Sequence, residues 1–138
     1  MTDYKGKFCL TDAKGIIIEY LPDIKCLLEQ TYWAKDRDMK TIETSIKYSK
    51  CFAIIDKEYE ILVGFARVIT DYATMYYLTD VVVDKAYRGQ GLGKWMLDWI
   101  VNEEISLKGY GLLKTGQAQE LYKELGFEEC QATCMWKP

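Results

Sequence analysis

The feature that most constrains this chain is a glycine-rich turn between an apolar run and an amphipathic run. Residues 76–83 read as a buried strand, and residues 92–100 place their apolar side chains on one helical face. A strand, a glycine turn and a helix N-terminus together favour an anion, because backbone N–H groups point outward there and the helix dipole attracts negative charge. Glycines also let a ligand approach without meeting a Cβ atom. The sequence therefore predicts a phosphate-bearing ligand at this turn, which reads Arg88-Gly89-Gln90-Gly91-Leu92-Gly93-Lys94.

Two common phosphate-binding motifs do not fit the spacing of this turn. A P-loop requires glycine where the chain has Arg88, and serine or threonine where it has Trp95. A dinucleotide fingerprint that starts at Gly89 requires glycine at the position of Lys94. A nucleotide site is therefore an alternative that the spacing argues against.

The turn matches a third pattern, Arg/Gln-x-x-Gly-x-Gly/Ala, over residues 88–93. In this it resembles the acyl-CoA pyrophosphate turn of the GNAT (Gcn5-related N-acetyltransferase) superfamily, and the resemblance extends from about Cys51 to the C-terminus. Residues 118–127 are similar to a second element of that family, Ala-x-x-x-Tyr-x-x-x-Gly-Phe. The resemblance implies an acyl-CoA N-acyltransferase fold with a central, mostly antiparallel, splayed sheet.

The order of the expected elements predicts one α+β domain over residues 1–138, described equally well as a mixed three-layer α/β/α fold. Hairpin-connected strands alternate with two strand–helix crossovers. In chain order we expect a hairpin of residues 8–10 and 16–18, helices beginning near Pro22 and Asp38, strands 51–56, 61–69 and 76–83, a helix at about 90–106, a strand at 107–113, a helix at 118–125, and strands 127–129 and 132–136.

Charge and cysteine content exclude several classes of protein. The net charge is −3 and the lysines are interleaved with acids, so we expect no nucleic-acid surface. No apolar run approaches the ~20 residues of a membrane span, and the N-terminus lacks the apolar segment of a signal peptide. Five cysteines without C-x-x-C spacing, and no histidine, indicate reduced thiols in a cytoplasmic protein without a metal site.

The resemblance implies that acetyl-CoA is the cosubstrate and assigns its binding residues. The central strand would carry the pantetheine arm along its backbone edge at Val81, Val82 and Val83, whose side chains can pack in the core at the same time. Lys94 would add a charge to a phosphate, although a solvated lysine explains it equally well. The pyrophosphate would be held by Arg88, Gly89, Gln90, Gly91, Leu92, Gly93 and Lys94.

Tyr122 is the tyrosine of the second family element. The resemblance implies that it is the general acid that protonates the leaving thiolate. A phenol with a pKa near ~10 can protonate a thiolate whose acid has a pKa near ~8.5. From the residues alone, Tyr122 also fits an apolar helical stripe with Ala118, Leu121 and Leu125, which makes a core tyrosine the alternative.

The general base is the weakest assignment, because the chain has no histidine. The candidates are Asp80, Glu19 and Asp71, acting directly or through water. Asp80 is the best of them because it precedes Val81, whose N–H is placed to polarise the thioester carbonyl. Carboxylates at strand ends are also commonly structural.

The parts of the chain least similar to the family are expected to bind the acceptor. Trp33, Asp71 and Tyr72 would hold a cationic amine by charge and by ring faces, and a packing cluster explains the same residues. The sequence thus predicts an N-acetyltransferase that acts by direct attack of a primary amine of a small molecule or protein. The alternative is a non-catalytic acyl-CoA-binding sensor or interaction module. Trp136 could also serve a homodimer contact.

Overall fold

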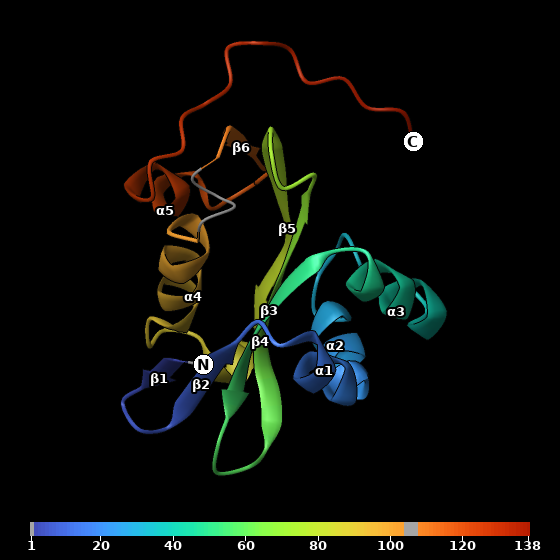
Figure 1. The fold of residues 1–138 in the computed structure, drawn as a ribbon, viewed down its shortest axis with the longest axis vertical. Coiled ribbons are helices and arrows are strands. Elements are labelled where there is room, and N and C mark those ends of the chain that lie inside the picture. Colours follow the sequence, from blue (N-terminus) through green and yellow to red (C-terminus); the bar gives the residue numbers. More distant parts are fainter. Residues whose placement is uncertain (1, 104–107) are drawn as a thin grey trace.

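The computed structural model describes residues 2–103 and 108–138 (Figure 1). Within these residues, six strands form one sheet whose spatial order follows the chain order. The strands are β1 (Thr2–Tyr4), β2 (Phe8–Thr11), β3 (Lys50–Asp56), β4 (Ile61–Thr70), β5 (Met75–Val83) and β6 (Tyr110–Leu112). The helices are α1 (Lys14–Ile17), α2 (Leu21–Leu28), α3 (Met39–Lys47), α4 (Leu92–Val101) and α5 (Gln119–Glu124), with 3-10 turns η1 (Ile18–Tyr20) and η2 (Lys85–Tyr87).

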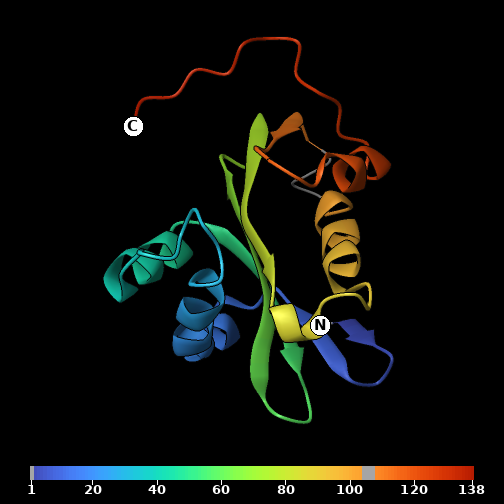
Figure 2. The same ribbon diagram turned by 180° about the vertical axis from the view of Figure 1, so that it is seen from behind.

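The sheet separates two helical layers, which confirms the predicted α+β fold. Helices α1, α2 and α3 cover one face, and α4 and α5 lie on the other (Figures 1 and 2). Each interface contains its own apolar cluster, one centred on α4 and the other on α2 and α3. All strand pairs are antiparallel except β5 with β6, so the sheet is mostly antiparallel, as expected.

Local signals placed most elements correctly. Asp38 caps α3 by accepting a hydrogen bond from the Thr41 N–H at 2.7 Å, and Pro22 lies in the first turn of α2. Gly126 has φ +96° after α5, and the Phe127 N–H reaches back to the Tyr122 carbonyl at 3.0 Å, which is a Schellman end. The predicted helix 90–106 and strand 107–113 correspond to α4 and β6; residues 104–107 lie outside the described residues.

The prediction of a strand at Ile16–Ile18 was wrong. These residues belong to α1 and η1, and Ile17 is buried between the helical layer and the sheet. The partner of β2 in the first hairpin is instead β1, joined to it by residues 5–7, of which Lys5 and Gly6 have positive φ. Three consecutive isoleucines favour a strand locally, but the burial of Ile17 in the apolar cluster between the helices and the sheet overrides that preference.

The predictions of strands at 127–129 and 132–136 were also wrong. The structure assigns no strand to residues 127–138, which leave α5 and arch over the end of the sheet (Figures 1 and 2), with the Trp136 ring 5.5 Å from the Lys114 Nζ. A strand requires a neighbour for its backbone groups, and within the described residues this segment has none.

The sheet opens between β5 and β6. These two strands pair only through Met75–Tyr77 and Tyr110–Leu112, and then diverge. Residues 78–83 of β5 therefore have β4 on one side and no strand partner on the other, among the described residues. This is the predicted splay, and it leaves backbone groups of β5 free at the edge that faces α4.

A bulge in β5 changes the direction of its side chains. Asp80 and Val81 together lie opposite Ala66 of β4, and Asp80 has φ +54°. Before the bulge Leu78 belongs to the apolar cluster around α4, whereas Val82 beyond it belongs to the cluster around α2 and α3. The extra residue therefore shifts the alternation of the strand by one position.

We predict that Gly111→Ala destabilises the opening of the sheet. A Cβ atom at Gly111 would lie 2.2 Å from the ring of buried Tyr76, so β6 or the ring must move. The free energy of unfolding should fall by about 1–3 kcal/mol in urea titrations, the usual cost of overpacking. Gly116→Ala is the control, since its Cβ atom would make only an ordinary contact at 3.6 Å. Equal stabilities of the two variants would contradict the packing of β6 against Tyr76.

Candidate active site

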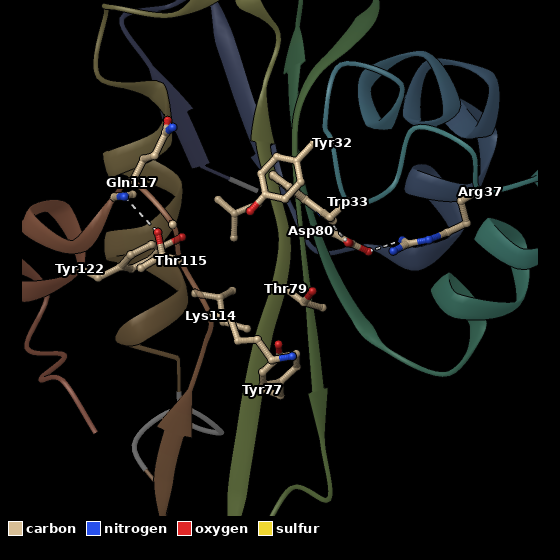
Figure 3. Close-up of a pocket in the computed structure, with 14 residues that line it drawn as sticks. Tyr32, Trp33, Arg37, Tyr77, Thr79, Asp80, Lys114, Thr115, Gln117 and Tyr122 are labelled. Carbon is tan, nitrogen blue, oxygen red and sulfur yellow. Dashed lines mark hydrogen bonds and ion pairs between the residues drawn. The ribbon is translucent and has the colours of Figure 1, made fainter. Parts of the chain in front are cut away.

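A cavity of about 620 Å³ lies where β5 and β6 diverge (Figure 3). One wall is residues 77–81 of β5, the second is residues 114–118 with Tyr122, and the third is the loop between α2 and α3. Aromatic and charged side chains from segments far apart in the chain meet here. Those labelled in Figure 3 are Tyr32, Trp33, Arg37, Tyr77, Thr79, Asp80, Lys114, Thr115, Gln117 and Tyr122.

Tyr122 reaches the cavity from α5. Its ring packs edge-on against Phe127, with centroids 5.8 Å apart, and only 8% of the residue is exposed. The hydroxyl has no hydrogen-bond partner among the described residues. Burial raises the pKa of this phenol above its ordinary value of 10. At neutral pH the Tyr122 hydroxyl is therefore protonated and available to donate a hydrogen bond into the cavity.

The carboxylate of Asp80 lies on the opposite wall and is bound by three side chains. The Trp33 indole N–H donates to Oδ1 at 3.2 Å, and Arg37 and Arg67 donate to Oδ2 at 2.7 and 2.9 Å. Asp80 is 3% exposed. Burial alone would raise its pKa, but the hydrogen bonds and charges of the two guanidiniums hold the pKa below its ordinary value. The site therefore contains a carboxylate that stays ionised.

The contacts of Asp80 make it a poor candidate for the general base. A proton acceptor needs a pKa near the working pH, whereas the pKa of Asp80 is held low and three of the roughly four acceptor sites of its carboxylate are already occupied. The bonds favour a positioning role, in which Asp80 holds Trp33 and Arg37 at the cavity wall. The other two candidates, Glu19 and Asp71, do not line the cavity.

The glycine turn has the conformation that anion binding requires. Gly89 and Gly91 both have φ +84°, and Gly91 begins α4 without a side-chain cap. No backbone N–H from residues 89 to 94 donates to another described residue. The turn thus presents a set of unpaired N–H donors at a helix N-terminus.

The turn is fixed to the end of β5 and has room beside it. The Arg88 Nε donates to the Val83 carbonyl at 2.9 Å, and the Tyr4 hydroxyl donates to the Gln90 carbonyl at 3.2 Å. A Cβ atom built at Gly89 meets nothing within 4 Å. These features fit a pyrophosphate, and the free edge of β5 leads from the turn to the cavity.

Two residues of the turn have restricted roles. The Leu92 side chain is buried in the apolar cluster, so only its backbone is available to a ligand. Lys94 is exposed, and its Nζ lies 3.6 Å from the Glu124 carboxylate, a spacing that leaves the amine accessible.

The structure does not bring together the three residues predicted to bind the acceptor. Trp33 lines the cavity, whereas Asp71 and Tyr72 do not. Asp71 closes the turn between β4 and β5 by accepting hydrogen bonds from the Thr74 hydroxyl and from the backbone of Ala73 and Thr74, and these bonds lower its pKa. Tyr72 is exposed, with φ +64°. A turn motif accounts for Asp71 without a ligand.

Sequence reasoning missed several residues of the cavity. Arg37 lies in a polar connector that carries no motif, and its pairing with Asp80 spans 43 positions. The only signal in the sequence was the small number of arginines, since the chain has just three: Arg37, Arg67 and Arg88. Residues 114–117 have no pattern of their own beyond preceding the tyrosine element.

The described part of the chain shows neither a metal cluster nor a membrane-spanning helix. No three His, Cys, Asp or Glu side chains there are grouped so that they could hold a metal ion. None of the described helices has the length and apolar character needed to cross a bilayer.

Comparison with known proteins gives a consistent result. The sequence profile of the acetyltransferase (GNAT) domain matches residues 47–129, more than half of the chain. A candidate acetyltransferase from Gibberella zeae is 31% identical over 121 residues, which cover 73% of this chain and 68% of that protein. The histone acetyltransferase TAP1 of Glycine max is 28% identical over 118 residues, 77% of this chain and 51% of that protein. The chain therefore spans 51% of the length of one of these curated relatives and 68% of the other.

A solved structure shares the fold almost end to end. A candidate GNAT-family acetyltransferase from Xanthomonas campestris pv. campestris superposes with a TM-score of 0.83 and 28% identity, over 95% of this chain and 94% of that chain. A probable acetyltransferase from Staphylococcus aureus superposes with a TM-score of 0.78 at 22% identity.

We predict that Asp80→Asn lowers stability in a pH-dependent way. Loss of the charge leaves Arg37 and Arg67 without a counter-ion, which should lower the free energy of unfolding by about 2–3 kcal/mol at pH 7. The loss is smaller than for a fully buried ion pair because both guanidiniums keep some exposure to solvent. The contribution of the Asp80 carboxylate to the free energy of unfolding is fully present above the ordinary carboxyl pKa of about 4. It is lost as the pH falls through the lower pKa that Asp80 has in the folded protein. The stability difference in urea titrations should therefore shrink below pH 4. Exposed Asp36→Asn, from the same loop, is the control, and a pH-independent difference would contradict the assignment.

Proposed function

Because the chain belongs to the GNAT acetyltransferase family, we propose that it transfers the acetyl group of acetyl-CoA to a primary amine of a small molecule or protein. One observation carries the proposal. The unpaired edge of β5 connects the glycine turn at α4 to a cavity that contains a protonated tyrosine, Tyr122. Donor-binding groups and a proton donor thus lie along one continuous surface.

The residues present fit acetyl-CoA, which would supply an activated thioester. The backbone edge at Val81, Val82 and Val83 offers hydrogen bonds to an extended amide chain, as an added strand would. The N–H groups of residues 89–94 and the dipole of α4 would hold the pyrophosphate, with Lys94 and Arg88 adding positive charge. The glycines keep side chains out of this path.

Tyr122 is the proposed general acid. Its hydroxyl would give its proton to the sulfur that departs when the amine forms its new bond to the acetyl carbon. A raised pKa suits this role, since the phenol remains protonated until a thiolate develops beside it.

The acceptor would enter from the side of the α2–α3 loop. Tyr32 and Trp33 offer aromatic faces there, and Asp80 keeps the indole of Trp33 in place. The carboxylate of Asp80 is balanced by two guanidiniums, and Lys114 also lines the cavity. This excess of positive charge disfavours an ammonium ion, so the amine would bind in its neutral, nucleophilic form.

One observation favours a second candidate, a non-catalytic acyl-CoA-binding module. The buried carboxylate of the cavity is already engaged, which leaves no dedicated base among the lining residues. Both candidates bind the donor, and only the enzyme releases free thiol when an amine is added.

We predict that Gly93→Asp weakens donor binding without unfolding the protein. A Cβ atom at Gly93 makes only an ordinary contact, 3.6 Å from Val83, and a carboxylate in the first turn of α4 agrees with the helix dipole. The same charge repels a pyrophosphate, so the Kd for CoA and acetyl-CoA should rise at least about tenfold, or ~1.4 kcal/mol. Calorimetric titration gives the Kd.

The neutral variant Gly93→Ala is the control for this experiment. Ligand at ~100 times its Kd adds about 2.7 kcal/mol to the folded state, so wild type should melt several degrees higher with CoA or acetyl-CoA. ATP and NAD should give much smaller shifts. Equal shifts with ATP, or unchanged CoA binding by Gly93→Asp, would show that the turn holds something else.

We predict that Tyr122→Phe lowers kcat about 10²-fold while the Kd for acetyl-CoA changes little. The phenyl ring keeps the packing against Phe127 and removes only the proton donor. Thiol release would be followed with the best acceptor from a panel of polyamines, amino acids, amino sugars and histone-tail peptides.

Exposed Tyr110→Phe is the matched control, because it removes a hydroxyl outside the cavity. An unchanged kcat in Tyr122→Phe would remove this tyrosine from the reaction. Wild type that binds acetyl-CoA but turns over none of the panel would favour the non-catalytic module.

A further inference from the structure

The candidate active site carries more positive charge than its one carboxylate balances. Among the described residues that line the cavity, Arg37 and Lys114 are cations and Asp80 is the single acid. Arg67 of β4, which does not line the cavity, also pairs with Asp80. The cavity and its wall thus hold three cations and one carboxylate, in a chain whose net charge is −3. This local reversal of the overall charge favours a ligand that has negative charge of its own.

The two arginines at Asp80 differ in the donors that they leave free. Arg67 donates from Nε to Asp80 and from Nη1 to the Ser49 hydroxyl, and its side chain is 12% exposed. Arg37 donates from Nη1 alone, at 2.7 Å, and its side chain is 22% exposed. A guanidinium has five N–H donors in a planar fork, so most donors of Arg37 have no acceptor among the described residues. Arg67 is therefore occupied within the fold, whereas Arg37 has donors left for a ligand.

Lys114 is the second cation of the lining without an acid of its own. Its Nζ lies 5.5 Å from the centroid of the Trp136 ring, and it forms no ion pair with a carboxylate of the described residues. The face of a ring attracts a cation but does not neutralise its charge. Lys114 and Arg37 reach the cavity from opposite walls (Figure 3). The positive potential therefore extends across the cavity, where it would attract an anionic ligand.

The phosphates of the proposed donor do not account for the free donors of Arg37. They would bind at the N–H groups of residues 89–94, which follow the end of β5 at Val83 and have Arg88 beside them. Arg37 instead lies against Asp80, before β5 ends. The donor therefore has its own positive site, and the charge at Arg37 is left for the acceptor.

Tyr32 limits the size of what can reach Arg37. A Cβ atom built at Gly116 would lie 3.6 Å from the Tyr32 hydroxyl, so the ring extends from the α2–α3 loop toward the opposite wall (Figure 3). The ring also packs edge-on against Trp33, with centroids 5.1 Å apart. Because Tyr32 is 80% exposed, it stands at the mouth of the cavity. The two rings narrow the approach and favour a small acceptor.

We propose that the acceptor is a small amine that also carries a carboxylate or phosphate group, and that Arg37 binds this anion. The inference rests on the proposed function, because it names the acceptor of the same site. The planar fork of a guanidinium matches two oxygens of either anion, and such charge-assisted bonds are stronger than neutral ones. Asp80 holds the guanidinium in place through its bond to Nη1. With the anion at Arg37, the amine would lie on the side of the cavity that carries Tyr122 (Figure 3).

The first experiment measures acceptor binding by calorimetric titration in saturating CoA, so that the glycine turn is occupied and does not bind an anionic probe. Glycine, β-alanine, γ-aminobutyrate and phenylalanine are each compared with their neutral primary amides, and phosphoethanolamine is compared with ethanolamine. Putrescine is the cationic member of the panel. In at least one pair, the anionic member should have a Kd at least about tenfold lower than its neutral partner. The pair that shows this difference distinguishes carboxylate from phosphate.

Three results would overturn the proposal. They are equal Kd values within every pair, no binding by any anionic member, and tightest binding by putrescine.

The variant Arg37→Gln tests the assignment to one residue. The Kd of the preferred anionic amine should rise at least about tenfold, while the Kd of its neutral partner should change little. Lys35→Gln is the matched control, because it removes an exposed cation from the same loop and should keep the preference. Thermal unfolding checks that both variants are folded. Equal weakening of both members of the pair, which a merely structural role predicts, or an unchanged preference would remove Arg37 from acceptor recognition.

These titrations need no turnover, so the recognition of the anion and the proposed transfer can fail separately. Release of free thiol from acetyl-CoA is followed with the same panel. A protein that binds the anionic amine without acetylating it would contradict the transfer and leave the recognition intact. A protein that acetylates neutral or cationic amines in preference to the anionic ones would contradict the recognition and leave the transfer intact.

Discussion

The buried carboxylate of Asp80 is the contact on which the rest of the site depends. It joins Trp33 and Arg37 of the α2–α3 loop to Arg67 of β4 and to the bulge in β5. An ion left unpaired in such a place costs several kcal/mol, so the carboxylate and its donors are required together. They also hold Asp80 at φ +54°, a conformation that a residue with a side chain adopts only when its surroundings enforce it.

The bulge and the divergence of β6 act together to create a usable edge. Free strand edges are usually a liability in a protein, because they attract other strands. Here the edge of β5 faces α4 and leads to the unpaired N–H groups of residues 89–94, so in the proposed function the same property would serve an extended ligand. The single bulge shifts Val82 to one apolar cluster while Leu78 stays in the other, which anchors the edge from both faces.

Sequence reasoning succeeded where the determining interaction is local. The glycine turn, the start of α3 near Asp38 and the end of α5 near residue 125 each depend on a few neighbouring residues, and all were placed correctly. It failed where contacts between residues far apart in the sequence determine the structure. Residues 16–18 are helical because Ile17 is buried in the apolar cluster between the helices and the sheet, and Arg37 meets Asp80 across 43 positions that no pattern connects. Residues 127–129 and 132–136 were predicted as strands, but a strand also requires a neighbour for its backbone groups, which the sequence pattern of the segment does not reveal.

In the proposed reaction, the charges around the cavity would help an amine to react although the chain has no histidine. Direct attack requires a neutral amine, and a general base is only one way to obtain it. Because Arg37 and Arg67 balance Asp80 and Lys114 adds a further positive charge, the field around the cavity opposes an ammonium ion. An amine that enters this field gives up its proton to water more readily than it does in bulk solution. In the proposed reaction, the same ion pairs that make Asp80 a poor base would reduce the need for one, and Tyr122 on the opposite wall would supply the proton that the departing thiolate requires.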